Sequence, residues 1–195
     1  MGAGSKSKMD RYKLIVVGDG GCGKTSLLTV FTKNYFPVEH DPTVFDMTTK
    51  DVQVAGKTVH LELWDTAGQE EYDSLRALGY PDTDVILLVF SIAHPASLIN
   101  AQEKWLPELE NYCHKKPIIL VGTKKDLRSD QKVMQHLASK GMEPIKPDVG
   151  KQVAAKIHAL AYLECSAIRG EGVKEIFDTA VRLITPRKKR FCSLM

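Results

Sequence analysis

The chain has 195 residues, of which 43% are hydrophobic and 26% charged, values that fit one globular domain and exclude disordered and fibrous proteins. Its net charge of +3 comes from the two ends, since residues 1–11 carry +2 and residues 187–190 carry +4; the mildly acidic remainder argues against a nucleic-acid-binding face. The longest apolar run, Val85 to Phe90, has the length of a strand and is far shorter than the roughly 18 residues of a membrane-spanning helix.

Short apolar runs alternate with helical patterns along the chain, which predicts an α/β protein with a mostly parallel sheet. Continuous apolar runs, typical of strands buried on both faces, lie at 14–17, 85–90 and 118–121. Apolar residues alternate with polar ones on either side of a turn at residues 55–57, which predicts one antiparallel hairpin.

Apolar residues at helical spacing predict amphipathic helices after most of these strands. The clearest stripe runs from Val173 to Ile184, and two others run from Leu98 to Tyr112 and from Val149 to Ile157. We interpret all three stripes as core packing. Because no repeat or linker precedes Pro186, we expect one domain over residues 12–185, between a short basic extension at 1–11 and a tail at 186–195.

Residues 18–25 match the phosphate-loop pattern G-x-x-x-x-G-K-[ST], after an apolar strand and at the start of a helix. Glycines let backbone N–H groups surround phosphate oxygens, and the helix N-terminus adds partial positive charge. The Lys24 ammonium can reach the β- and γ-phosphates, and the Thr25 hydroxyl suits Mg²⁺. The pattern predicts a nucleoside triphosphate site made of Gly18, Asp19, Gly20, Gly21, Cys22, Gly23, Lys24 and Thr25.

A second group of candidate residues follows the strand expected at 59–64. The Asp65 carboxylate, at the end of that strand, suits a contact to Mg²⁺, directly or through water. Gly68 can bring its N–H close to a γ-phosphate, and Gln69 has the reach to orient an attacking water. These residues predict hydrolysis of the bound nucleotide.

The residues after strand 118–121 predict guanine as the base. The Asp126 carboxylate can accept hydrogen bonds from guanine N1–H and its 2-amino group, donors that adenine lacks, and such matched sites discriminate by about 10⁴ to 10⁵. The stem of Lys124 can lie along the base, and Phe36 can cover its other edge. A loop after the strand at 162–164 can offer an N–H to guanine O6, whereas Lys125 is interpreted as a solvated loop residue. The expected base site also includes Thr123, Ser166, Ala167 and Ile168.

Together these elements resemble the small GTPases of the Ras superfamily, from about Lys13 to the C-terminus. Within it, the segments WDTAGQEE at 64–71 and YPDTDV at 80–85 resemble the Rho family, with mixed Rho-like and Rac-like residues at 123–128 and 168. The resemblance implies a P-loop fold of six mostly parallel strands with about five helices. It also implies a further insert helix at about 129–141, within a GTPase domain at 12–185.

The resemblance implies two switch segments, switch I at 36–46 and switch II at 65–78. Thr43 would contact Mg²⁺ and the γ-phosphate only in the GTP state, and Lys24, Thr43, Gly68 and Gln69 would carry hydrolysis. The expected partners are exchange factors, GTPase-activating proteins that donate an arginine, a dissociation inhibitor, and effectors, with actin control as the process.

Two alternatives to a cycling GTPase stay open at this point. His40 stands where the Rho family usually has a tyrosine that covers the phosphates, which bears on lid closure and effector affinity but not on Mg²⁺ binding. His40 and Gly21 keep open the alternative of a GTP-bound binding module with little regulated hydrolysis. Gly20 and Gln69 favour the cycling enzyme. A P-loop ATPase or kinase is the more distant alternative, and Asp126 argues against it.

The last four residues, Cys192 to Met195, match the C-a-a-X prenylation pattern, with methionine typical of farnesylation. Each basic residue near an anionic leaflet contributes on the order of 1 kcal/mol, and one lipid chain usually needs such a second signal. We therefore expect a lipid-anchored, carboxyl-methylated protein at the cytoplasmic face of the plasma membrane or endomembranes, with a cytosolic pool. Lys6 argues against myristoylation, and the spacing of the cysteines favours a reduced cytosolic chain.

Overall fold

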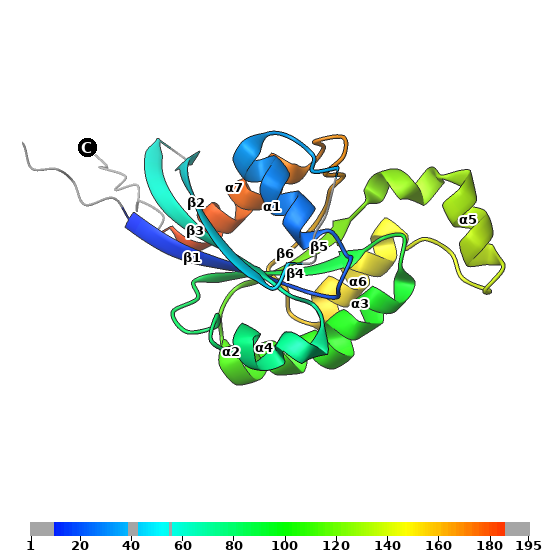
Figure 1. Ribbon diagram of the computed structural model, residues 1–195, viewed down its shortest axis with the longest axis horizontal. Coiled ribbons are helices and arrows are strands. Elements are labelled where there is room, and N and C mark those ends of the chain that lie inside the picture. Colours follow the sequence, from blue (N-terminus) through cyan, green and yellow to red (C-terminus); the bar gives the residue numbers. More distant parts are fainter. Residues whose placement is uncertain (1–9, 39–42, 55, 186–195) are drawn as a thin grey trace, which may run out of the picture.

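The computed structural model describes residues 10–38, 43–54 and 56–185 (Figure 1). Six strands form one sheet in the order β2-β3-β1-β4-β5-β6. Their bounds are β1 (Asp10–Val17), β2 (Phe45–Val54), β3 (Lys57–Thr66), β4 (Val85–Ser91), β5 (Ile118–Thr123) and β6 (Ala161–Glu164). Within the described residues, β2 and β3 pair antiparallel and the other neighbouring strands pair parallel. This confirms the predicted mostly parallel sheet, although β1 begins at Asp10, two residues before the expected domain start.

Helices cover both faces of the sheet (Figure 1). One face packs on α1 (Lys24–Lys33) and α7 (Val173–Ile184), whose apolar residues join the core cluster around Leu14 and Val16. The other face carries α2 (Asp73–Ala77), α3 (Pro95–Asn100), α4 (Leu106–Tyr112) and α6 (Pro147–Lys156). The predicted insert helix is confirmed as α5 (Gln131–Ala138), which projects beyond the sheet and is capped by the Asp130 carboxylate accepting from the Val133 N–H.

The apolar stripe from Leu98 to Tyr112 forms a helix with an irregular centre. A π-helical segment, η2 (Ala101–Trp105), joins α3 to α4 without a break in the chain. Tyr112 is 50% exposed, so its assignment to the core is wrong; its ring covers the buried ring of Tyr80. Such π segments are frequent at functional sites.

A second correction concerns the stripe that begins at Val149. Val149 is 39% exposed, and the buried face of α6 instead starts at Gly150, whose missing side chain leaves room for the Tyr162 ring. The contact is close because an added Cβ at Gly150 would lie 2.2 Å from the ring. In the parts of the chain that the structure describes, no helix has both the length and the apolar character needed to cross a bilayer.

Candidate nucleotide site

Four segments that the sequence singled out meet at the carboxyl edge of the sheet, where open α/β sheets bind ligands. They follow β1, β3, β5 and β6, at residues 18–23, 67–69, 124–126 and 165–167. A cavity of about 410 Å³ lies there. It is lined by Gly20, Gly21, Gly23, Lys24, Thr25, Ser26, Phe36, Thr43, Thr66, Ala67, Gly68, Gln69 and Lys124.

The phosphate loop is held by its own lysine. Lys24 is 6% exposed, and its ammonium donates to the backbone carbonyls of Gly18 at 2.8 Å and Asp19 at 2.9 Å. The first turn of α1 contains no acidic residue, so the helix N-terminus and Lys24 together make an electropositive cradle. Cys22 is buried, and burial raises the pKa of its thiol, which fits the role of a small residue that fills the loop.

Thr25, Thr43 and Asp65 come together beside this loop. The hydroxyls of Thr25 and Thr43 lie 2.7 Å apart. Asp65 is 5% exposed, and its Oδ1 has no hydrogen-bond partner among the described residues. Burial raises the pKa of Asp65, even though Thr25, Lys24 and Thr43 favour the ionised form. A buried carboxylate oxygen beside two hydroxyls fits Mg²⁺, which prefers oxygen ligands.

Switch II lies directly against the phosphate loop. A Cβ added to Gly68 would lie 2.2 Å from the backbone nitrogen of Gly20, so no side chain fits at Gly68. A Cβ added to Gly20 would lie 3.7 Å from the Gln69 amide. Gly20, Gly68 and Gln69 are therefore brought together as the sequence predicted.

The segment after β5 is hydrogen-bonded to the phosphate loop. The Thr123 hydroxyl lies 2.5 Å from the Cys22 carbonyl and 3.0 Å from the Phe90 carbonyl, so it faces the loop and β4. Lys124 adopts the left-handed conformation, with φ 58°, and its ammonium donates to the Gly21 carbonyl at 2.8 Å. Asp126 follows with a buried Oδ1 that has no hydrogen-bond partner in the described chain. This orphaned oxygen is the feature that an acceptor site for guanine requires.

The loop after β6 has two backbone N–H groups without a backbone acceptor among the described residues. The N–H of Cys165 donates to Gly122 and that of Ser166 donates to Glu171, whereas the N–H groups of Ala167 and Ile168 remain as candidates for guanine O6. Ile168 is 61% exposed. Of the predicted base-site residues after β5 and β6, Lys124 lines the cavity, whereas Asp126, Ser166, Ala167 and Ile168 lie outside its lining.

Lys125, interpreted as a solvated loop residue, is partly exposed but also has partners in the loop after β6. Its ammonium lies 3.0 Å from the Glu171 carboxylate, and its N–H donates to the Cys165 carbonyl at 3.0 Å. Lys125 therefore ties together the loops after β5 and β6, a role that needs a partner 46 positions away and carries no local signal.

The comparisons with known proteins agree with this site. A family model described as the Ras family matches residues 13–186. Proteins named Rho-related GTP-binding protein RhoB from Homo sapiens, Mus musculus and Rattus norvegicus are each 57% identical over 172 residues, covering 88% of this chain and 88% of each relative. The chain belongs to the Rho family of small GTPases. As a Rho-family GTPase it binds guanine nucleotide, hydrolyses GTP, and works as a switch with regulators and effectors as its kinds of partner.

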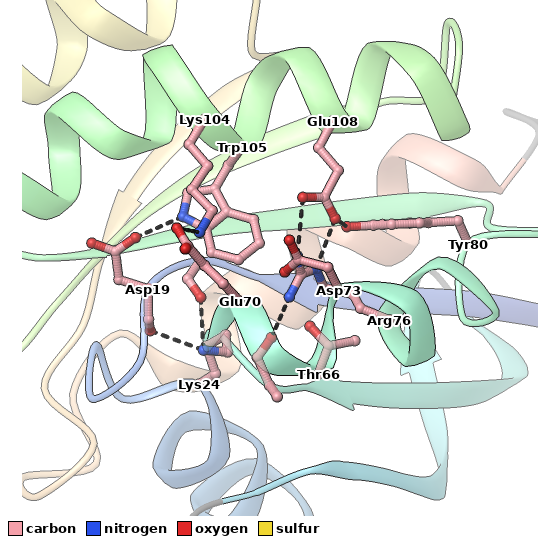
Figure 2. A network of polar contacts seen from close by, with 12 residues as sticks. Asp19, Lys24, Thr66, Glu70, Asp73, Arg76, Tyr80, Lys104, Trp105 and Glu108 are labelled. Atoms are coloured by element: carbon pink, nitrogen blue, oxygen red, sulfur yellow. Dashed lines mark hydrogen bonds and ion pairs between the residues drawn. The ribbon is translucent and has the colours of Figure 1, made fainter.

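One part of this Rho-family site escapes sequence reasoning. The Asp19 carboxylate points away from the phosphate cavity and accepts hydrogen bonds from Asn100 at 2.8 Å and Trp105 at 2.7 Å (Figure 2 shows Asp19 and Trp105). Asp19 therefore belongs to the loop through its backbone, while its side chain anchors the loop to α3 and η2. His40 and Cys192, two further residues singled out from the sequence, lie outside the described residues.

Proposed function

We propose that this Rho-family GTPase acts at the cytoplasmic face of a membrane, engages effectors through switch I and switch II in the GTP state, and controls the actin cytoskeleton and cell shape. The observation that supports the switch most directly is that both segments touch the phosphate loop, through Thr43 on Thr25 and through Gly68 on Gly20. Loss of the γ-phosphate would therefore change the contacts of both segments at the same time.

Exposed apolar side chains on and beside the switch segments support a role in partner binding. Val38 is 91% exposed and Leu78 is 72% exposed. Val44 and Met47, which are 40% and 50% exposed, add further apolar surface at and next to switch I. Such apolar surface is what regulators and effectors bury in an interface.

For the chemistry, we propose that Lys24 stabilises charge on the β- and γ-phosphates and that Gly68 donates its N–H to the γ-phosphate. Gln69 orients the water that attacks the γ-phosphorus, so that the bond to the β–γ bridging oxygen breaks and GDP and phosphate leave. A partner's arginine completes the charge stabilisation. Gly18 to Thr25 surround the phosphates, and Phe36, Lys124, Asp126 and Ala167 hold the base, with Thr123 and Ser166 as their supports and Ile168 at the rim.

We propose that Thr25, Thr43 and Asp65 hold Mg²⁺, which neutralises phosphate charge when bound. Replacing Asp65 by asparagine is expected to raise at least tenfold the Mg²⁺ concentration that half-suppresses GDP release. Burial raises the pKa of Asp65 in the folded protein above its pKa in the unfolded chain. Between these two pKa values the folded metal-free protein binds more protons than the unfolded chain, so its stability falls as pH rises from the lower pKa to the higher. Asp65→Asn removes this loss.

The measurement is GDP release against Mg²⁺ concentration, with thermal unfolding of the metal-free protein against pH. Asp46→Asn is the matched control, because the exposed Asp46 carboxylate also raises the pKa of Asp65 but is not one of the three proposed Mg²⁺ ligands. An unchanged Mg²⁺ requirement in Asp65→Asn would show that Asp65 holds no cation.

The membrane part of the proposal rests on the sequence of the tail. Replacing Cys192 by serine is expected to move the protein from the membrane to the soluble fraction of cells, because the basic residues 187–190 alone contribute only on the order of 1 kcal/mol each. Ser193→Ala, which keeps the C-a-a-X pattern, is the control and should stay on membranes. Unchanged membrane attachment of Cys192→Ser would contradict lipidation there.

A further inference from the structure

The helix formed by α3, η2 and α4 holds the phosphate loop from one side. Asn100 and Trp105 donate to the two carboxylate oxygens of Asp19, and no ion pair to Asp19 is present among the described residues. Trp105 is fully buried. Hydrogen bonds to a charged acceptor are among the stronger polar contacts in proteins, so two neutral donors fix the carboxylate firmly.

The same helix also holds switch II, through side chains that extend from it in the same direction as Trp105 (Figure 2). Lys104 pairs with Glu70 at 2.8 Å. Arg76, 1% exposed, donates to the Glu108 carboxylate at 2.7 and 3.1 Å and to the Ala67 carbonyl at 2.9 Å. A buried guanidinium is tolerated because each of these contacts offsets its desolvation.

Trp105 is the point at which these two sets of contacts meet. The edge of its indole donates to Asp19, and the Arg76 guanidinium lies 4.6 Å from the centre of its ring. A shift of the indole therefore moves the phosphate loop and switch II together. The two segments touch each other at Gly20, Gly68 and Gln69, where a small displacement changes a close contact.

We propose that Asp19 and Trp105 are positioning residues that couple the phosphate loop to switch II, so that nucleotide retention and the placement of Gln69 depend on one indole. The hydrolysis half of this inference rests on the proposed role of Gln69, whereas the nucleotide-retention half does not. Trp105→Phe tests the coupling, because phenylalanine keeps an aromatic face near Arg76 and removes the N–H donor together with part of the volume of the buried indole.

The first test observes the hydrogen bond itself. The chain has two tryptophans, and the Nε1 of Trp64 has no hydrogen-bond partner among the described residues. In the ¹⁵N-labelled full-length protein, Trp64→Phe assigns the two indole signals. We expect the Trp105 signal to shift in Asp19→Asn and between GDP and a non-hydrolysable GTP analogue, and to stay fixed in Glu103→Gln, an exposed change on the same helix. A Trp105 signal that ignores Asp19→Asn would overturn the proposal.

The second test is a double-mutant cycle on GDP release. Asp19→Asn and Trp105→Phe should each raise the GDP dissociation rate about tenfold, and the double variant should be no faster than either single one. Effects that multiply to about a hundredfold would mean two independent losses of structure and would overturn the coupling.

The third test measures the rate of GTP hydrolysis in the presence of an activating protein. Trp105→Phe should lower GTP turnover about tenfold in the wild-type background and have no further effect in Gln69→Leu. Unchanged turnover in Trp105→Phe would overturn the coupling to switch II. If Gln69→Leu itself turned over GTP normally, the proposed role of Gln69 would fail. The indole signal and the GDP-release cycle would still test whether the Trp105–Asp19 hydrogen bond holds the phosphate loop.

Discussion

Replacing Gly20 by valine is expected to abolish the acceleration of GTP hydrolysis by an activating protein, a loss of about 10³- to 10⁵-fold. A Cβ at Gly20 would lie 3.7 Å from the Gln69 amide, an ordinary contact distance, but the two further methyl groups of valine extend into the space of that amide. The backbone at Gly20 is not in the left-handed region, so the loop can still form and bind GTP. The variant should therefore stay in the GTP state.

The measurement is a single-turnover GTP assay with an activating protein. Gln69→Leu should show the same loss, and the combined variant should be no slower, because both changes act on one side chain. Gly20→Ala, which adds only the Cβ, is the graded control and should lose less activity than Gly20→Val. Wild-type turnover from either Gly20→Val or Gln69→Leu would refute the role of Gln69.

Replacing Asp126 by asparagine is expected to weaken guanine nucleotide binding by about 10²- to 10⁴-fold. Two hydrogen bonds to a charged acceptor, each contributing about 1.5–3 kcal/mol, are lost or mismatched. The buried Oδ1 of Asp126 has no hydrogen-bond partner in the described chain, so the carboxylate is ready to accept from the base. An amide instead presents one donor and one acceptor, which matches a base with an N1–H and a C2 carbonyl, as in xanthine.

This change is measured by competition between guanosine diphosphate and xanthosine diphosphate for binding to the full-length protein. Affinity should shift from the guanine toward the xanthine nucleotide in Asp126→Asn. Asp148→Asn, which changes an exposed carboxylate paired with Lys151, should leave both affinities as in the wild type. Equal losses for the two nucleotides in Asp126→Asn would point to damaged folding and contradict direct base reading.

Much of the fold could be predicted because the signals are local. Strands β4 and β5 appear as continuous apolar runs because helices cover both of their faces, and α7 shows one unbroken apolar stripe. The motif residues meet because parallel strands bring their carboxyl ends to one edge. Lys24, Thr25 and Asp126 could therefore be placed near one another from spacing and strand order alone.

The remaining features depend on contacts between distant segments. The side chain of Asp19 could not be distinguished from a phosphate-facing residue, because its donors lie 81 and 86 positions away. The π-helical turn that presents Trp105 has no composition that separates it from an α-helix. Val149 is exposed and Gly150 is buried instead, because the Tyr162 ring packs where a side chain at position 150 would lie. Residue propensities and hydrophobic periodicity describe neighbouring residues only, so they do not predict these contacts between distant segments.

The most direct test of the GTPase switch is to identify the nucleotide released from the denatured, purified protein and then to time its hydrolysis. The account predicts guanine nucleotide alone, with bound GTP converted slowly to GDP by the protein and rapidly once an activating protein is added. Release of adenine nucleotide would contradict the base site at Asp126. Release of GTP that persists with activating protein present would contradict the cycling enzyme and favour a constitutively GTP-bound binding module.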